Sequence, residues 1–159
     1  MTSVRPILLV EDNPKDVELI FAALRKSNLA NEVVVARDGA EALDYLYRRG
    51  KFQSRKADLP IVIFLDLKMP KVDGLEVLRR IRADARTALI PVVILTTSAE
   101  EEDVVAGYSG GANAYVRKPV KFSAFAEAVN TIGVFWLFLS EPMPDALSPI
   151  RPAAQPATP

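Results

Sequence analysis

The chain has 159 residues, and its 20 lysines and arginines balance 20 aspartates and glutamates, so the formal net charge is zero. This length suits one domain with a proper core, and the neutral balance gives no reason to expect nucleic acid or an anionic membrane as a partner. The absence of cysteine and histidine excludes disulfides, thiolate or histidine-assisted nucleophiles and the usual zinc sites. Any chemistry must therefore use carboxylates, lysine, hydroxyls and a metal that prefers oxygen ligands.

The first half of the chain alternates short apolar runs, typical of buried strands, with longer amphipathic stretches, typical of helices. Asn13 suits the N-cap position of the first helix, and Pro14 suits its first helical position. In chain order we predict a strand at 7–10, a helix at 14–27, a strand at 32–36, a helix at 38–49 and a polar, basic surface loop at 50–59.

The second half of the chain continues the same alternation. Ser98 and Glu101 have the spacing of a capping box, with Ser98 as the N-cap of the fourth helix, and Gly110 and Gly111 end that helix. In chain order we predict a strand at 61–65, a helix from 74 to about 85, a strand at 92–95, a helix between Ser98 and Gly110, a strand at 114–116 and a helix at 123–139.

The strand–helix pair occurs five times along the chain. This order predicts an α/β fold with a five-stranded parallel sheet that is doubly wound, with helices covering both faces. In such sheets, functional residues gather at the carboxyl ends of the strands. The residues at those positions are Glu11, Asp12, Asp66, Thr96 and Lys118, all of them polar and most of them ionisable.

Three of these residues, Glu11, Asp12 and Asp66, are carboxylates that the fold would bring close together. Like charges at such distances raise one another's pKa unless a cation neutralises them, and Mg²⁺ is the cation that suits oxygen ligands. Lys118 adds a positive charge that can hold a phosphate or pair with Asp66, and Thr96 offers a hydroxyl to an anion. Each residue alone is more often a turn, cap or strand residue, but together they are the parts for phosphoryl transfer onto Asp66.

This set of residues resembles a known family, the receiver domains of two-component response regulators, which have a flavodoxin-like, CheY-like fold. The resemblance covers residues 5 to about 132 and rests on the acidic pair Glu11–Asp12, on Asp66, Asp73–Gly74, Thr96, Tyr115 and Lys118–Pro119. More narrowly, residues 10–14, the basic insertion at 50–57 and residues 95–98 and 135–137 resemble single-domain regulators that partner phytochrome histidine kinases.

The resemblance implies a role for each matching residue of the site. Asp66 is the expected phosphoacceptor, and Lys118 is expected to contact the phosphoryl group. Asp12, Asp66 and the backbone carbonyl of Lys68 are expected to bind Mg²⁺ directly, with Glu11 acting through a water molecule.

The resemblance also implies a switch. Phosphorylation is expected to draw Thr96 inward and to let Tyr115 turn into the vacated space. That movement would change the surface made by the fourth helix, the fifth strand and the fifth helix. The Lys118–Pro119 peptide bond is expected to be cis, because the lysine must turn back over the site directly after a strand.

The function that these residues favour is a single-domain response regulator that accepts a phosphoryl group from the phosphohistidine of a separate histidine kinase. With no histidine of its own, this chain cannot be the donor. It would catalyse only its own phosphorylation and dephosphorylation, and would signal by binding an unknown downstream protein. An aspartyl phosphatase would need an acid where Lys68 stands, and a flavin or nucleotide site would need glycines after residue 10. A receiver-like scaffold without phosphotransfer is the remaining alternative.

We expect a receiver domain over residues 1–139 and a proline-rich tail over 140–159. The apolar run 134–139 cannot point all its side chains at the sheet from one helix, so we expect a homodimer through the last helix, with Phe135, Trp136 and Phe138 at the interface. The alternative is that the tail folds back over Trp136 within one subunit. No signal peptide or membrane span is evident, which favours a cytoplasmic protein without a membrane partner.

Overall fold

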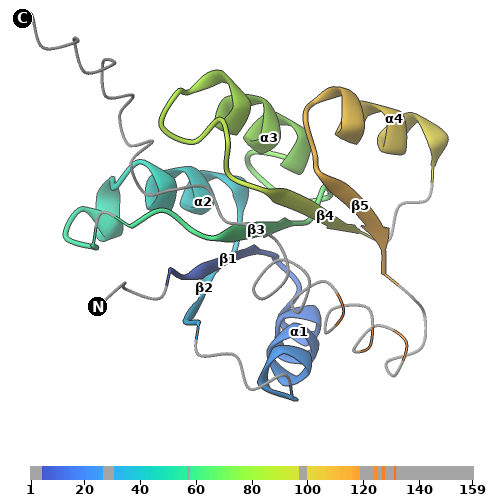
Figure 1. Ribbon diagram of the computed structural model, residues 1–159, viewed down its shortest axis with the longest axis horizontal. Coiled ribbons are helices and arrows are strands. Elements are labelled where there is room, and N and C mark those ends of the chain that lie inside the picture. The colour runs from blue at the N-terminus through green and yellow to red at the C-terminus, as the bar shows by residue number, and fades with distance from the viewer. Residues whose placement is uncertain are drawn as a thin grey trace, which may run out of the picture.

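The computed structural model describes residues 5–26, 31–56, 58–96 and 100–118, together with residues 124, 127 and 131. Five parallel strands form one sheet in the order β2-β1-β3-β4-β5 (Figure 1), which confirms the predicted fold class. The strands are β1 (Ile7–Val10), β2 (Val33–Ala36), β3 (Val62–Leu65), β4 (Val92–Thr96) and β5 (Ala114–Arg117). The α-helices are α1 (Pro14–Lys26), α2 (Gly39–Leu46), α3 (Gly74–Ala83) and α4 (Glu101–Ser109).

The sheet is covered on both faces, because successive side chains of a strand point to opposite sides. In β1, Leu8 and Val10 belong to the apolar cluster under α2 and α3, whereas Ile7 and Leu9 belong to the cluster under α1. Figure 1 shows α1 on one face of the sheet and α2, α3 and α4 on the other. Burial on both faces explains why the strands have continuous apolar sequences.

Helix α1 begins as the sequence predicts. The side chain of Asn13 accepts a hydrogen bond from the backbone N–H of Lys15 at 3.0 Å, and the carbonyl of Asn13 accepts the first helical bond from Val17 at 3.1 Å. Pro14 occupies the first helical position, where a missing N–H costs nothing. The start of α1 is therefore fixed directly after β1, beside the strand-end carboxylates.

Helix α4 begins later than the sequence predicts. Its N-cap is Glu100, which has an extended backbone and makes no capping hydrogen bond with its side chain. The predicted capping box is wrong, because Glu101 is the first helical residue rather than the third and Ser98 is not the N-cap. The predicted end is confirmed, since Gly110 is the C-cap and its N–H donates to the carbonyl of Ala106.

The predicted basic surface loop after α2 is an organised segment. It contains a short 3₁₀ helix at Gly50–Phe52, and the side chain of Arg55 folds back under the end of α2. The guanidinium of Arg55 donates to the carbonyls of Tyr45 at 2.6 Å, Leu46 at 3.1 Å and Asp58 at 3.1 Å. Helix ends leave such carbonyls without intrahelical partners. Arg55 therefore caps the C-terminal end of α2, although it lies nine residues after the last residue of that helix.

The last predicted helix is described only at Ala124, Glu127 and Thr131, which are helical. The Thr131 hydroxyl donates to the carbonyl of Glu127 at 2.9 Å, one turn earlier. The Lys118–Pro119 bond and the expected dimer residues Phe135, Trp136 and Phe138 lie outside the described residues, so those predictions remain untested. Within the described part of the chain, no helix is long and apolar enough to cross a membrane.

Candidate functional site

The strand-end carboxylates meet because β1 and β3 are neighbours in register. Val10 pairs with Leu65, so the residues that follow them leave the sheet side by side. The backbone N–H of Asp66 donates to the carbonyl of Val10 at 3.0 Å, which continues the ladder one residue past the strand. Glu11, Asp12 and Asp66 each offer a carboxylate oxygen within 4.8 Å of the others. The grouping predicted from the sequence is therefore present.

The loop after β3 is folded tightly against the backbone of Asp66. A Cβ atom on Gly74 would lie 2.2 Å from the Asp66 carbonyl oxygen, so only glycine fits there. The N–H of Gly74 donates to the Leu67 carbonyl at 2.9 Å, and Asp73 caps α3 by accepting from the N–H of Glu76 at 3.0 Å. These contacts hold the loop that carries Lys68, and with it the backbone carbonyl expected to bind metal.

Lys118 enters the site from β5. Its backbone N–H donates to the carbonyl of Thr96 at 2.7 Å, and its side chain is buried. The ammonium nitrogen lies 2.5 Å from Oε2 of Glu11, 2.8 Å from Oδ2 of Asp16 and 3.7 Å from Oδ2 of Asp66. The predicted ion pair with Asp66 is thus present, but it is the longest of the three.

Asp16 is the site residue that the sequence analysis missed. It lies in the first turn of α1, where an acidic residue is favoured by the helix dipole alone. The available signal was its position, five residues after Glu11 and in the first turn of the predicted helix, where side chains tilt back toward the helix start and so toward the carboxyl edge of the sheet. Its contact with Lys118 adds a fourth carboxylate to the site.

Burial dominates the electrostatics of the site. The side chain of Glu11 is almost fully buried, which raises its pKa from 4.5 to about 7, although the hydrogen bond from Lys118 acts in the opposite direction. The negative charge of Asp66 is a second cause of this increase. Burial by itself would lower the pKa of Lys118, but its hydrogen bonds to Asp16 and Glu11 raise that pKa above its ordinary value. Lys118 is therefore charged, and the surplus of carboxylates around it favours a further cation.

The two expected switch residues lie on neighbouring strands. Thr96 ends β4, is fully buried and pairs with Arg117 of β5. Tyr115 lies two residues before that pairing and is half-buried against the cluster under α2 and α3. A Cβ atom on Gly107 of α4 would lie 3.1 Å from the Tyr115 ring. Because Gly107 has no side chain, the Tyr115 ring can pack closely against α4.

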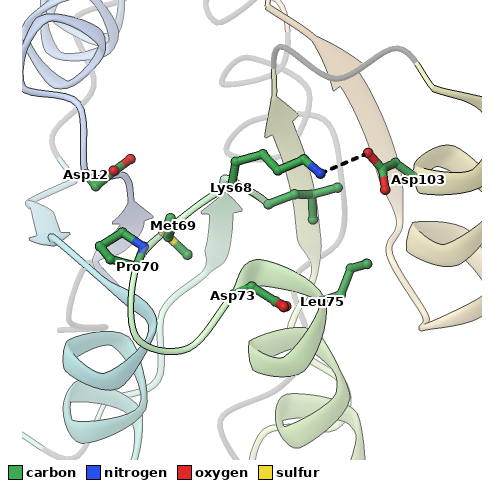
Figure 2. Close-up of a pocket in the computed structure, with 8 residues that line it drawn as sticks. Asp12, Lys68, Met69, Pro70, Asp73, Leu75 and Asp103 are labelled. Carbon is green, nitrogen blue, oxygen red and sulfur yellow. Dashed lines mark ion pairs between the residues drawn. The ribbon is translucent and has the colours of Figure 1, made fainter.

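An open pocket of about 380 Å³ adjoins the acidic cluster. Its lining residues are Asp12, Leu67, Lys68, Met69, Pro70, Asp73, Leu75 and Asp103. Figure 2 shows Lys68 reaching across from the loop after β3 to Asp103 on α4, and the two charged atoms lie 3.5 Å apart. Asp12 faces this opening from the end of β1, so a ligand in the pocket can approach the carboxylates from solvent.

The donor set fits a divalent cation. Oxygen ligands within a few ångströms of one another are what Mg²⁺ and related ions bind, usually with several waters retained. Glu11 and Asp66 are buried, whereas Asp12 is exposed at the pocket. The cluster therefore combines two buried carboxylates with one that solvent can reach. The buried carboxylates are also hydrogen-bonded: Glu11 accepts from the N–H of Asn13 at 3.1 Å, which fixes one of its oxygens.

Comparison with known proteins identifies the family to which the sequence is similar. A family model described as the response regulator receiver domain matches residues 7–130, a range that includes every strand-end residue of the site. Among curated proteins, Response regulator Rcp1 of Synechocystis sp. is 39% identical over 131 residues, covering 82% of this chain and 88% of Rcp1.

Solved structures agree with the fold, and one of them is a metal-bound form. The phosphorylated cyanobacterial phytochrome response regulator RcpA has a TM-score of 0.84 and 39% identity, covering 89% of this chain and 100% of RcpA. The bacteriophytochrome response regulator AtBRR has a TM-score of 0.71 and 56% identity, covering 87% of this chain and 99% of AtBRR. Rcp1 has been solved in an Mn²⁺-bound form, with a TM-score of 0.82 and 36% identity, covering 88% of this chain and 99% of that one. The acidic cluster here and the metal in that relative both point to divalent-metal binding.

Proposed function

This chain belongs to the response regulator receiver domain family, and we propose that it accepts a phosphoryl group on Asp66 from a histidine kinase. The observation that carries the proposal is the buried carboxylate of Asp66 beside two further carboxylates and a buried lysine. Asp66 also lies at the carboxyl end of a central strand, the part of a parallel sheet where ligands bind.

The reaction that suits this arrangement is transfer from a phosphohistidine. A carboxylate oxygen of Asp66 attacks phosphorus, a P–O bond forms, the P–N bond breaks and the electron pair leaves with the imidazole of the kinase. The product is an acyl phosphate, which water later hydrolyses to restore the carboxylate and release inorganic phosphate. With no histidine in the sequence, this chain is the acceptor in the exchange.

The neighbouring residues supply charge and positioning. Asp12, Asp66 and the backbone carbonyl of Lys68 would hold Mg²⁺, with Glu11 acting through water, and the bound ion would neutralise charge on the phosphoryl oxygens. Lys118 is buried and charged close to Asp66, so its ammonium group can donate to a phosphoryl oxygen. Together these groups would offset the repulsion between an anionic donor and three carboxylates.

The output would pass through Thr96 and Tyr115. The Thr96 hydroxyl would donate to the phosphoryl group, and the Tyr115 ring would turn further inward toward the space that Thr96 leaves. Both residues lie on the β4–β5 side of the sheet, next to α4. A downstream protein would therefore read the surface made by α4, β5 and the last helix, and signalling would occur by protein–protein contact.

We further propose that the kinase is a phytochrome. The support is the likeness to named phytochrome response regulators, among them RcpA at 39% identity and AtBRR at 56% identity. The test is phosphotransfer from a light-activated phytochrome kinase, compared with an unrelated histidine kinase at equal phosphohistidine concentration. Faster labelling by the phytochrome kinase is expected, and equal rates would contradict this choice of partner.

The acceptor assignment is tested with Asp66→Asn, which keeps the size of the side chain and removes its charge. Incubation of the wild type with acetyl phosphate and Mg²⁺ should add one phosphate, about 80 Da, and the variant should gain none. Intact mass spectrometry measures both, and equal thermal unfolding of the two proteins controls for folding. Equal labelling of wild type and variant would remove Asp66 from the mechanism.

A further inference from the structure

We propose that Asp16 is a positioning residue that holds the ammonium group of Lys118 clear of Asp66, so that the acceptor carboxylate stays open to phosphorus. The inference rests on the proposed function and adds a residue that the sequence analysis did not assign to the site. It follows from how the carboxylates of the site share one buried lysine.

The distances divide these carboxylates into two classes. Glu11 and Asp16 lie at hydrogen-bond distance from the Lys118 nitrogen, at 2.5 and 2.8 Å, whereas Asp66 lies at 3.7 Å, too far for a hydrogen bond. An ammonium group has three donors. Within the described part of the chain, Glu11 and Asp16 accept hydrogen bonds from two of them, and a gap of 3.7 Å separates the nitrogen from Oδ2 of Asp66. An oxygen of a phosphoryl group on Asp66 would extend into that gap.

Asp16 differs from Glu11 in its relation to the metal site. Glu11 belongs to the acidic cluster that can hold a cation, together with Asp12 and Asp66, whereas Asp16 does not. A cation in that cluster would compete with Lys118 for the Glu11 carboxylate. Asp16 would then be the remaining carboxylate that keeps the Lys118 nitrogen beyond hydrogen-bond distance of Asp66. A direct hydrogen bond would occupy an oxygen of Asp66 and weaken it as a nucleophile.

The position of Asp16 is fixed by the fold. It lies in the first turn of α1, between Pro14 at the helix start and Val17, which is buried against the sheet. Its side chain is 22% exposed, compared with 6% for Lys118, so Asp16 is the more exposed partner of this ion pair. A purely local role remains the rival explanation, because any acid in the first turn interacts favourably with the helix dipole.

The experiment compares Asp16→Asn with Glu18→Gln, a matched loss of charge at an exposed position of α1. Phosphorylation of Asp66 by acetyl phosphate is followed by intact mass at saturating Mg²⁺, and metal affinity is measured separately with Mn²⁺. We expect Asp16→Asn to slow phosphorylation at least about fivefold, the scale of losing one charge-assisted hydrogen bond, with Mn²⁺ affinity unchanged. Glu18→Gln should react at the wild-type rate, and Asp16→Glu should recover part of the loss.

A crystal structure of Asp16→Asn gives a second measure that does not depend on rates. The nitrogen of Lys118 is expected to move toward Asp66, to less than the 3.7 Å seen here. An unmoved lysine, an unchanged or faster reaction, or equal slowing by Glu18→Gln would overturn the positioning role. If the wild type itself gains no phosphate on Asp66, the proposed function fails, which is a separate result from failure of the Asp16 variant alone.

Discussion

At the scale of single residues, the site is a balance between burial and charge. Glu11 and Lys118 are both buried, and each is tolerated because it pairs with the other. A buried ion pair of this kind contributes little net stability, since desolvation offsets the attraction, but removing either partner is costly. The excess of carboxylates around Lys118 is therefore better explained by a site for a cation and a phosphoryl group than by stability.

The raised pKa of Glu11 predicts that metal affinity depends on pH. Burial raises this pKa to about 7, so Glu11 is mostly protonated below that pH and mostly ionised above it. A metal competes with the proton, so the dissociation constant for Mn²⁺ should increase as pH falls from 8 to 6, by up to about tenfold per unit below the pKa.

Titrations at fixed ionic strength would measure this dependence. The control is Glu11→Gln, which should bind Mn²⁺ more weakly and lose the pH dependence around pH 7, because its side chain cannot ionise. A pH dependence of the same slope in Glu11→Gln would assign the titration to another group.

At the scale of elements, the segment after α2 shows how one side chain can organise a loop. Arg55 donates to backbone carbonyls of α2 and of the loop, and its guanidinium lies 4.3 Å from the centre of the Tyr45 ring. Arg55→Ala leaves these carbonyls without that partner, so the free energy of unfolding should fall by about 1–3 kcal/mol.

Urea unfolding measures this loss. The matched control is Lys56→Ala, an exposed neighbour whose removal should change stability by less than about 0.5 kcal/mol. Equal effects of the two substitutions would mean that Arg55 contributes no more than an ordinary surface residue.

The contact between α4 and β5 gives a second prediction at this scale. A Cβ atom on Gly107 would lie 2.8 Å from Ile94 Cδ1 and 3.1 Å from the Tyr115 ring. Gly107→Ala should therefore destabilise the protein, although alanine favours a helix over glycine by about 1 kcal/mol. The added methyl should also push Tyr115 outward.

A double-mutant cycle separates these effects. Tyr115→Ala removes the ring, so Gly107→Ala should cost less stability in that background than in the wild type, and urea unfolding of all four proteins gives the coupling. An additive cycle would show that the Tyr115 ring does not limit the space at Gly107.

At the scale of the whole molecule, the apolar run at 134–139 predicts an interface between two copies of the chain. Phe135, Trp136 and Phe138 lie in an uninterrupted apolar run, and we predict that they form a homodimer interface. Light scattering at tens of micromolar should give a dimer for the wild type and a monomer for Phe135→Ala/Trp136→Ala. A monomeric wild type would refute the prediction, and a dimeric double variant would place the interface elsewhere.

The sequence by itself determined the sheet and the core of the site. Continuous apolar runs mark strands that are buried on both faces, and polar residues that directly follow such runs must stand at the carboxyl edge. For that reason the grouping of Glu11, Asp12 and Asp66 was predictable from positions along the chain. The start of α4 was not, because its N-cap, Glu100, makes no capping hydrogen bond with its side chain, so the capping pattern does not locate the start of the helix.

Only the tertiary structure decided which carboxylates hold Lys118. Asp16 and Lys118 are 102 residues apart, and their contact depends on how α1 packs across the sheet and on how a long side chain bends at the end of β5. The same holds for Arg55, whose partners are backbone carbonyls that carry no sequence signal. Residue patterns encode which face of an element is buried, whereas contacts between distant polar side chains are fixed only when the elements have packed.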